Sequence, residues 1–263
     1  LNYVLDFTIV NMQKNISGLT GINVAWKIIR DLMNIVFIFL LVYEGIKLII
    51  DQGDLKSLKN FIFGVVLASL LINFSLFFTK VLIDASNVVT LGIYTSITGP
   101  NGSAINSGLS TPITNALGVS SIYGDKAPPD IFTGRNMGKK LVMLFGSGIV
   151  ILVSAFAFFA IAIMFIIRFI ALVLLMMTSP IAYMGMAIPA MKSYSNEWWE
   201  SLKGQLLFAP VFMVMILISI TLMSSPGFIV EKDFASLMDT SEKPDFSTMG
   251  LMLNFTVIIG LIF

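Results

Sequence analysis

The sequence predicts an all-α fold: a polytopic transmembrane helical bundle with five or six spans and one long polar loop. Hydrophobic residues make up 57% and charged residues only 12% of the 263 residues, and the mean hydropathy is +0.92. A single water-soluble core of this size could not hide so much apolar side chain. Several apolar runs also approach or exceed the roughly 20 residues that a helix needs to cross a bilayer.

The composition also excludes several function classes. Cysteine and histidine are both absent, which removes thiolate and imidazole catalysis, disulfides and the usual ligands of zinc, haem and iron–sulfur clusters. The formal net charge is +1, so no general electrostatic field favours nucleic acid. We therefore expect no enzymatic activity, no catalytic or metal-binding residues, no cofactor and no stable nucleic-acid binding.

Residues 1–30 form a polar or amphipathic N-terminal segment. Two apolar runs follow, LMNIVFIFLLVYEGIKLII at 32–50 and FIFGVVLASLLINFSLFFTKVLI at 61–83. A short polar turn joins them, so we expect an antiparallel transmembrane hairpin that covers residues 31–97 with a helical extension. Gly, Ser, Thr, Asn and Pro dominate residues 98–140, which predicts a long, water-exposed and poorly regular loop.

The apolar run at 141–177 would measure about 55 Å as one helix, which exceeds a single bilayer crossing. Either Arg168 marks a turn between two short spans, where it snorkels to water, or one long helix protrudes and ends at Thr178-Ser179-Pro180. Because neither Gly nor Pro lies near Arg168, we favour the long helix. In that interpretation Arg168 lies near a membrane interface, and the segment up to Pro180 packs inside an assembly.

Residues 141–223 are expected to contain transmembrane helices with an interfacial tryptophan segment, and Pro210 is a predicted kink. An acidic loop at 224–248 and the start of a final transmembrane segment at 249–263 complete the chain. The sequence starts at Leu1 and stops within an apolar run, so we expect both ends to be cuts in a longer protein.

Polar residues inside apolar runs are costly in a membrane and therefore point to function. Glu44, Lys47 and Asp51 share one helix face as an intramembrane charge cluster, and they either pair with each other or snorkel to water at the membrane edge. A second stripe lies on one side of the next span. Its members are Ser69, Asn73, Lys80, Asp84 and Asn87.

This stripe is predicted to meet another helix, another subunit or a water-filled pore, because a lipid-facing stripe would be costly. The alternative is that its lower half lies outside the bilayer. We assign the same helix-packing or pore-facing role to Arg168.

Tyr194, Trp198 and Trp199 are predicted to form an interfacial belt, because indole rings favour the headgroup level. The alternative is a docking surface for a partner, since tryptophan is enriched where proteins bind each other.

Three stretches together resemble one known family. They are LINFSLFFTKVLIDASN at 71–87, IIRFIALVLLMMTSPIAYMGMAIP at 166–189 and EWWESLKGQLLFAPVF at 197–212. The pattern is similar to the TrbL family, the polytopic inner-membrane channel subunits of VirB-type type IV secretion systems, in the version found in candidate-phylum bacteria.

The resemblance implies a multi-pass protein of the bacterial inner (cytoplasmic) membrane, whose copies form a ring that serves as a channel or platform for conjugation or pilus-like protein transport. The implied partners are membrane lipid, further copies of the chain, other inner-membrane subunits, stalk or pilus subunits and separate ATPases. The chain has no G-x-x-x-x-G-K-[ST] phosphate loop of its own, which agrees with separate ATPases.

Two alternatives remain, one for the orientation of the chain in the membrane and one for its function. The resemblance implies a periplasmic loop before residue 141, whereas Arg135, Lys139 and Lys140 would favour the cytoplasm under the positive-inside rule. The alternative function is a stand-alone small-solute transporter or ion channel.

Overall fold

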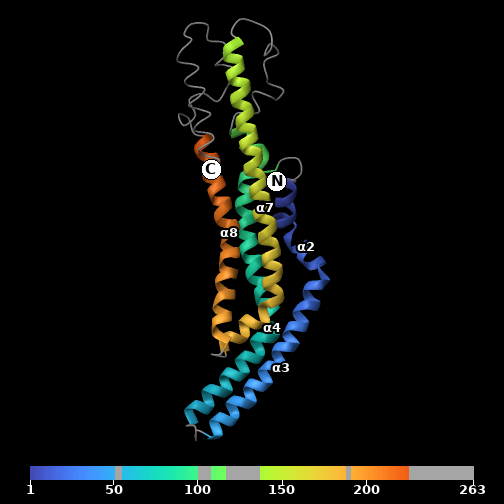
Figure 1. Cartoon of the computed structure of the whole chain (residues 1–263), viewed down its shortest axis with the longest axis vertical. Helices are drawn as coiled ribbons and strands as arrows, with labels where there is room; N and C mark the ends of the chain where they lie inside the picture. The colour runs from blue at the N-terminus through green and yellow to red at the C-terminus, as the bar shows by residue number, and fades with distance from the viewer. Residues whose placement is uncertain (51–54, 100–107, 117–136, 188–190, 225–263) are drawn as a thin grey trace. The chain divides into compact units, whose positions relative to one another are not determined.

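A computed structural model describes residues 1–50, 55–99, 108–116, 137–187 and 191–224 of the chain, and the regular structure of these residues is entirely helical (Figure 1). The predicted all-α class is therefore confirmed for the described residues. The elements are α1 (Asn2–Leu5), the π-helix η1 (Asp6–Val10), α2 (Met12–Gly18), α3 (Thr20–Ile50), α4 (Leu55–Thr98), α5 (Ser110–Ala116), α7 (Met137–Ala187) and α8 (Lys192–Ser224).

Four helices are long and apolar enough to cross a membrane, which indicates a membrane protein. Their candidate spans are Thr20–Ile50, Ile62–Thr98, Gly148–Gly185 and Lys192–Leu222. Only 6% of the most apolar 18-residue window of α3 is buried, so most of that window is left to face lipid or another chain. The final span predicted at 249–263 lies outside the described residues.

α7 is one continuous helix of 51 residues, about 77 Å long at the normal helical rise. The alternative of a turn at Arg168 is therefore wrong, and the single long helix is confirmed. The predicted end at Thr178-Ser179-Pro180 is also wrong, because α7 continues through Pro180 to Ala187. Pro210 likewise lies inside α8 and does not end it.

The reason that α7 survives Pro180 lies in the residue before it. Proline has no N–H, so the carbonyl of Met176, four residues earlier, loses its normal helical partner. The hydroxyl of Ser179 donates a hydrogen bond to this carbonyl at 2.9 Å. Serine and threonine side chains commonly satisfy such carbonyls in membrane helices. Here the hydrogen bond from Ser179 replaces the missing backbone bond, so the helix continues.

The described residues divide into two compact units. The first contains Leu1–Asp6, Leu91–Phe165 and the chain from Val211 onward, and the second contains Phe7–Thr90 and Ile166–Pro210. α4, α7 and α8 contribute residues to both units.

In the first unit, the start of the chain is held against α5. The side-chain amide of Asn2 donates to the hydroxyl of Ser110 at 2.8 Å, and its oxygen accepts the backbone N–H of Ser110 at 3.2 Å. Gly108 lies against the Asn2 side chain and leaves no room for a Cβ atom. The buried Leu109 and the helix α5 show that this part of the predicted irregular loop is ordered and helical; most of the remaining loop lies outside the described residues.

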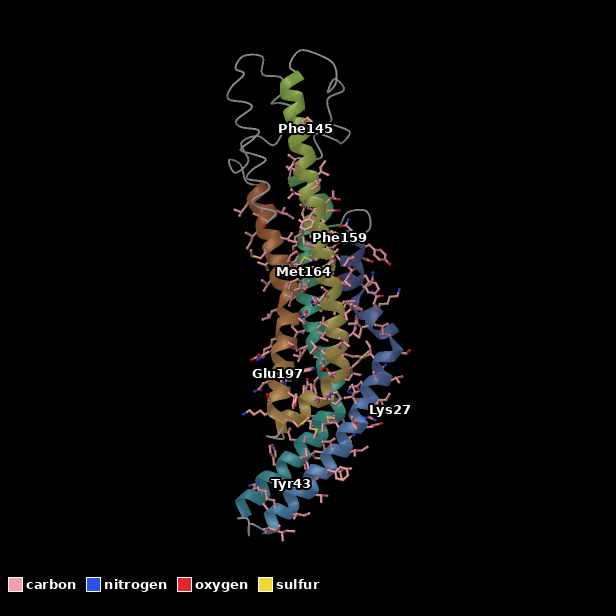
Figure 2. All side chains as sticks on the ribbon, in the orientation of Figure 1. Lys27, Tyr43, Phe145, Phe159, Met164 and Glu197 are labelled. Carbon is pink, nitrogen blue, oxygen red and sulfur yellow. The ribbon has the colours of Figure 1, made fainter. Side chains whose placement is uncertain are left out.

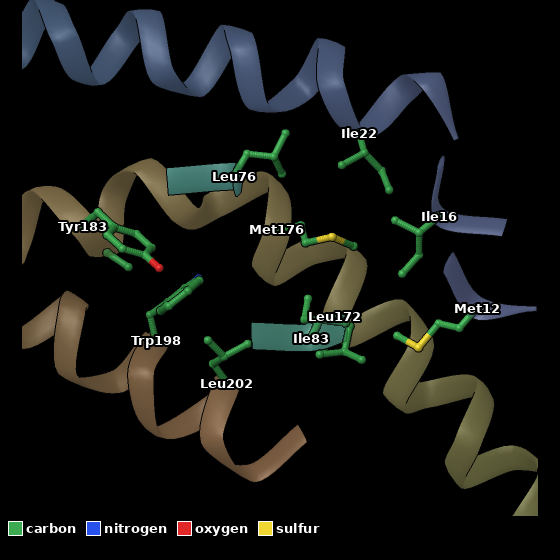
Figure 3. Close-up of a cluster of buried hydrophobic side chains, with 11 residues drawn as sticks. Met12, Ile16, Ile22, Leu76, Ile83, Leu172, Met176, Tyr183, Trp198 and Leu202 are labelled. Atoms are coloured by element: carbon green, nitrogen blue, oxygen red, sulfur yellow. The ribbon is translucent and has the colours of Figure 1, made fainter. Parts of the chain in front are cut away.

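The second unit contains an apolar core (Figure 3). In Figure 1 the first part of α4 runs beside α3, and the indole N–H of Trp26 on α3 donates to the hydroxyl of Ser75 on α4 at 2.9 Å. The core side chains come from α2, α3, α4, α7 and α8. They are Met12, Ile16, Ile22, Leu76, Ile83, Leu172, Met176, Ala182, Tyr183, Trp198 and Leu202.

Apolar side chains also project outward along the helices, as Figure 2 shows. Tyr43 is 63% exposed and Phe159 is 65% exposed. Lipid tails are as apolar as these side chains, so exposure to lipid costs little, and close packing with interhelical hydrogen bonds must hold the helices together. The polar contacts between helices are therefore the informative part of this fold.

Candidate functional site

The face of α4 that packs in the second unit is built from apolar and small hydroxyl side chains. Ser75 and Thr79 are fully buried, and their hydroxyls donate to carbonyls of the same helix, those of Ile72 and Ser75. This local bonding lets a hydroxyl enter an apolar interface without an unpaired donor. The other buried residues of this face in the unit are Ala68, Ile72, Leu76, Ile83 and Thr90.

The predicted polar stripe lies beside this packed face. Asn73 is exposed, and its amide donates to the Ser69 carbonyl of the same helix at 2.9 Å. An exposed amide in an apolar span leaves a polar group at the protein surface. Asn73 has no hydrogen bond to another helix among the described residues.

Lys80 and Asp84 lie farther along the stripe and are half-buried. They line a cavity of about 140 Å³ together with Gln13 and Ser17 of α2. Their opposite charges attract each other, but in the described part of the chain they form no ion pair within 4.0 Å; the pair found there joins Arg30 to Asp31 at 2.6 Å.

The stripe joins other elements at its far end. The amide of Asn87 donates to the carbonyl of Ile9 in η1 at 2.9 Å. Its neighbour Ser86 donates to the carbonyl of Leu206 in α8. These two side chains connect α4 to η1 and to α8, and Ser86 is a contact that the sequence analysis missed.

Arg168 is 1% exposed, although an arginine usually keeps its head in water. Its Nε donates to the carbonyl of Gln205 in α8 at 3.0 Å, while its Nη2 is buried and has no hydrogen-bond partner among the described residues. Arg168 thus links α7 to α8 by a charge-assisted hydrogen bond and does not snorkel. Whether it lies near a membrane interface stays a prediction.

The predicted interfacial belt includes Trp198 and Trp199. Trp198 is only 8% exposed, and its indole N–H donates to the Leu175 carbonyl and to the Thr178 hydroxyl of α7, both at 3.2 Å. The ring of Trp198 therefore fills the space between α7 and α8, and its depth in a membrane stays a prediction. Tyr194 is 62% exposed, as a belt residue requires.

Tyr183 of α7 completes an aromatic cluster with this pair. Its ring centroid lies 5.9 Å from that of Trp198 and 5.4 Å from that of Trp199, both edge-on. It also stacks on Phe78 of α4 at 6.1 Å. The cluster holds α4, α7 and α8 together, and such ring pairs add about 0.5 to 1.5 kcal/mol beyond their area burial.

Gly185 makes the close approach of α7 and α8 possible at their shared corner. A Cβ atom there would lie 2.5 Å from the Met191 carbonyl oxygen and 2.6 Å from the Ser195 Cβ. The hydroxyl of Ser195 donates to the Ala182 carbonyl at 2.7 Å. The start of α8 is thereby fixed against the end of α7.

The predicted charge cluster on α3 is described only in part. Lys47 is exposed near the end of α3. The side chain of Glu44 and the whole of Asp51 lie outside what the structure describes, so their pairing stays a prediction.

Comparison of the chain with protein-family models, curated proteins and solved structures gives no match.

Proposed function

We propose that the chain is an inner-membrane channel or platform subunit of a bacterial type IV secretion apparatus, of the conjugation or pilus-like kind. Copies of the chain form an oligomeric passage or base for export, and separate ATPases supply the energy. The proposal starts from the resemblance to the TrbL family in residues 71–87, 166–189 and 197–212.

One observation supports it above all: these three stretches contact one another within the second unit. The hydroxyl of Ser86 reaches the third stretch at the Leu206 carbonyl. Arg168 of the second stretch reaches the Gln205 carbonyl. If the resemblance reflects a common fold, the stretches that carry it should pack together, and these three do.

The polar surface of α4 gives further support to an assembly. Asn73 is an exposed amide within a candidate span, and asparagine in a membrane helix can bond across to a second helix for about 1 to 2 kcal/mol. In a chain that acts alone, this amide would face lipid. In an assembly, it can form a hydrogen bond with a helix of a neighbouring subunit.

A native-detergent pull-down from cells that make the tagged chain, followed by mass spectrometry, tests the proposal. We expect other secretion-system inner-membrane proteins, stalk or pilus subunits and an ATPase to co-purify. Recovery of the chain by itself, with a thermal stability that a small solute raises, would contradict the proposal and favour the stand-alone transporter or ion channel.

A further inference from the structure

The corner between α7 and α8 holds a second, larger cavity, of about 500 Å³. This size is typical of small-molecule sites, which run from about 300 to 1,000 Å³. Its polar lining comes from α8 and consists of Lys192, Ser195, Asn196, Trp199, Glu200 and Lys203. These positions recur every three or four residues and so share one side of the helix.

Three charged side chains line the cavity. Lys192, Glu200 and Lys203 are exposed, and the described residues contain no ion pair that involves any of them. Two ammonium groups with one carboxylate suit a ligand that carries both a negative and a positive group. A ligand with only negative charge would be repelled by the carboxylate of Glu200.

The ring of Trp199 forms part of the cavity wall. Its indole N–H is buried and has no partner among the described residues, whereas the neighbouring Trp198 has two acceptors. Tyr183 and Trp198 pack edge-on against the Trp199 ring and fix it in place. The ring is therefore a fixed wall of the cavity, and its buried N–H does not contact a ligand that enters from outside.

The cavity also lies where the sequence of α8 changes from polar to apolar. Lys203 is the last charged residue of the helix, and Leu207, one turn later on the same side, is 62% exposed. Headgroups lie at such a boundary, with the acyl chains alongside the apolar turns, and basic pockets between membrane helices bind lipid phosphates.

We propose that this cavity binds the headgroup of a phosphatidylethanolamine molecule. The phosphate is held by the ammonium groups of Lys192 and Lys203, and the ammonium group of the lipid pairs with Glu200. The inference depends on insertion of the chain into a membrane and is independent of the proposed secretion role.

The first test measures lipid binding to the purified, delipidated chain in detergent. Phosphatidylethanolamine should raise the melting temperature and remain bound in native mass spectrometry, phosphatidylglycerol should do both more weakly, and inorganic phosphate should do neither. Changing both lysines, Lys192→Gln with Lys203→Gln, should abolish the effect. Lys14→Gln with Lys27→Gln, which alters two exposed lysines elsewhere by the same charge, should leave it intact.

The conservative pair Lys192→Arg with Lys203→Arg keeps both charges and should retain binding, which separates a lost site from a lost fold. Equal stabilisation of the parent and the glutamine pair by phosphatidylethanolamine would overturn the site. Stabilisation by inorganic phosphate as strong as by the lipid would overturn the assignment to a lipid headgroup.

The second test addresses headgroup selection. Glu200→Gln should reduce the preference for phosphatidylethanolamine over phosphatidylglycerol by roughly tenfold, because a charge-assisted contact to the ammonium group is lost. Glu197→Gln is the matched control, since Glu197 lies on the same helix (Figure 2) and is exposed. It does not line the cavity. An unchanged preference in Glu200→Gln would overturn the role of this carboxylate.

Discussion

Arg168 is a buried cation without a carboxylate partner among the described residues. Taking a charge out of water costs several kcal/mol, and its hydrogen bond to Gln205 returns about 1.5 to 3 kcal/mol. The arginine is therefore expected to be costly to the isolated chain and retained for function.

Arg168→Met should leave the thermal stability of the purified chain in detergent unchanged or higher, because the desolvation cost disappears while the long side chain is kept. The same variant should lower the yield of intact complex from membranes. Unfolding scans and native electrophoresis measure the two effects. A melting temperature several degrees below the parent would show instead that the hydrogen bond to Gln205 outweighs the desolvation.

The two adjacent tryptophans provide a matched pair of variants. Trp198→Phe removes a donor that has two acceptors on α7, whereas Trp199→Phe removes a donor that has none in the described structure. In lipid-free detergent, Trp198→Phe should lower the free energy of unfolding by about 1 to 3 kcal/mol more than Trp199→Phe does. Equal losses, measured by reversible unfolding in mixed micelles, would show that ring packing alone decides their contributions.

The sequence singled out Arg168 and Asn87 because a charge or an amide within an apolar run is conspicuous. It missed Ser75 and Ser86, which also join helices. Serine is common in membrane helices and often bonds only its own backbone, so no one-dimensional pattern separates a structural hydroxyl from a neutral one. The burial of Trp198 was not predicted, because it depends on which neighbour covers the ring, and sequence spacing does not record that.

For α7, the sequence predicted correctly that the helix is continuous, but it did not predict where the helix ends. The lack of Gly and Pro near Arg168 correctly predicted continuity. Pro180 suggested a helix end, because proline removes a backbone donor. The compensating bond from Ser179 to Met176 depends on a side-chain rotamer, which the sequence does not specify.

This compensation makes a prediction about α7. Ser179→Ala should cost about 1 to 3 kcal/mol of unfolding free energy, since it leaves the carbonyl of the buried Met176 unpaired. In a Pro180→Ala background the backbone N–H returns, so the same change should cost much less. A double-mutant cycle by thermal unfolding measures the difference.

The control for this cycle is Ser201→Ala. Ser201 is exposed and bonds the Glu197 carbonyl of its own helix, so its removal should stay within about 0.5 kcal/mol of the parent. Equal costs of Ser179→Ala in both backgrounds would refute the compensation.

At the scale of the whole molecule, the first question is whether the polar stripe of α4 is an interface between subunits. Lys80 and Asp84 are half-buried beside α2, so in the isolated chain their pairing should contribute only about 0 to 1 kcal/mol. If a second subunit covers this face, removing one partner leaves a buried charge that costs about 3 to 5 kcal/mol. Lys80→Ala and Asp84→Ala should then each reduce the intact complex seen on native gels.

The exchanged pair, Lys80→Asp with Asp84→Lys, should recover part of the complex, because the attraction is kept. Lys14→Ala, an exposed lysine of α2 outside the cavity lining, should assemble like the parent. If all variants assemble like the parent, the stripe is not an interface between subunits.

The proposed function requires several copies of the chain in one membrane complex. Native mass spectrometry of the complex extracted gently from membranes counts the copies directly. We expect more than two copies of the chain in one particle, together with other secretion-system proteins. Particles that contain one or two copies and no other protein, across detergents that keep membrane complexes intact, would contradict the proposed function.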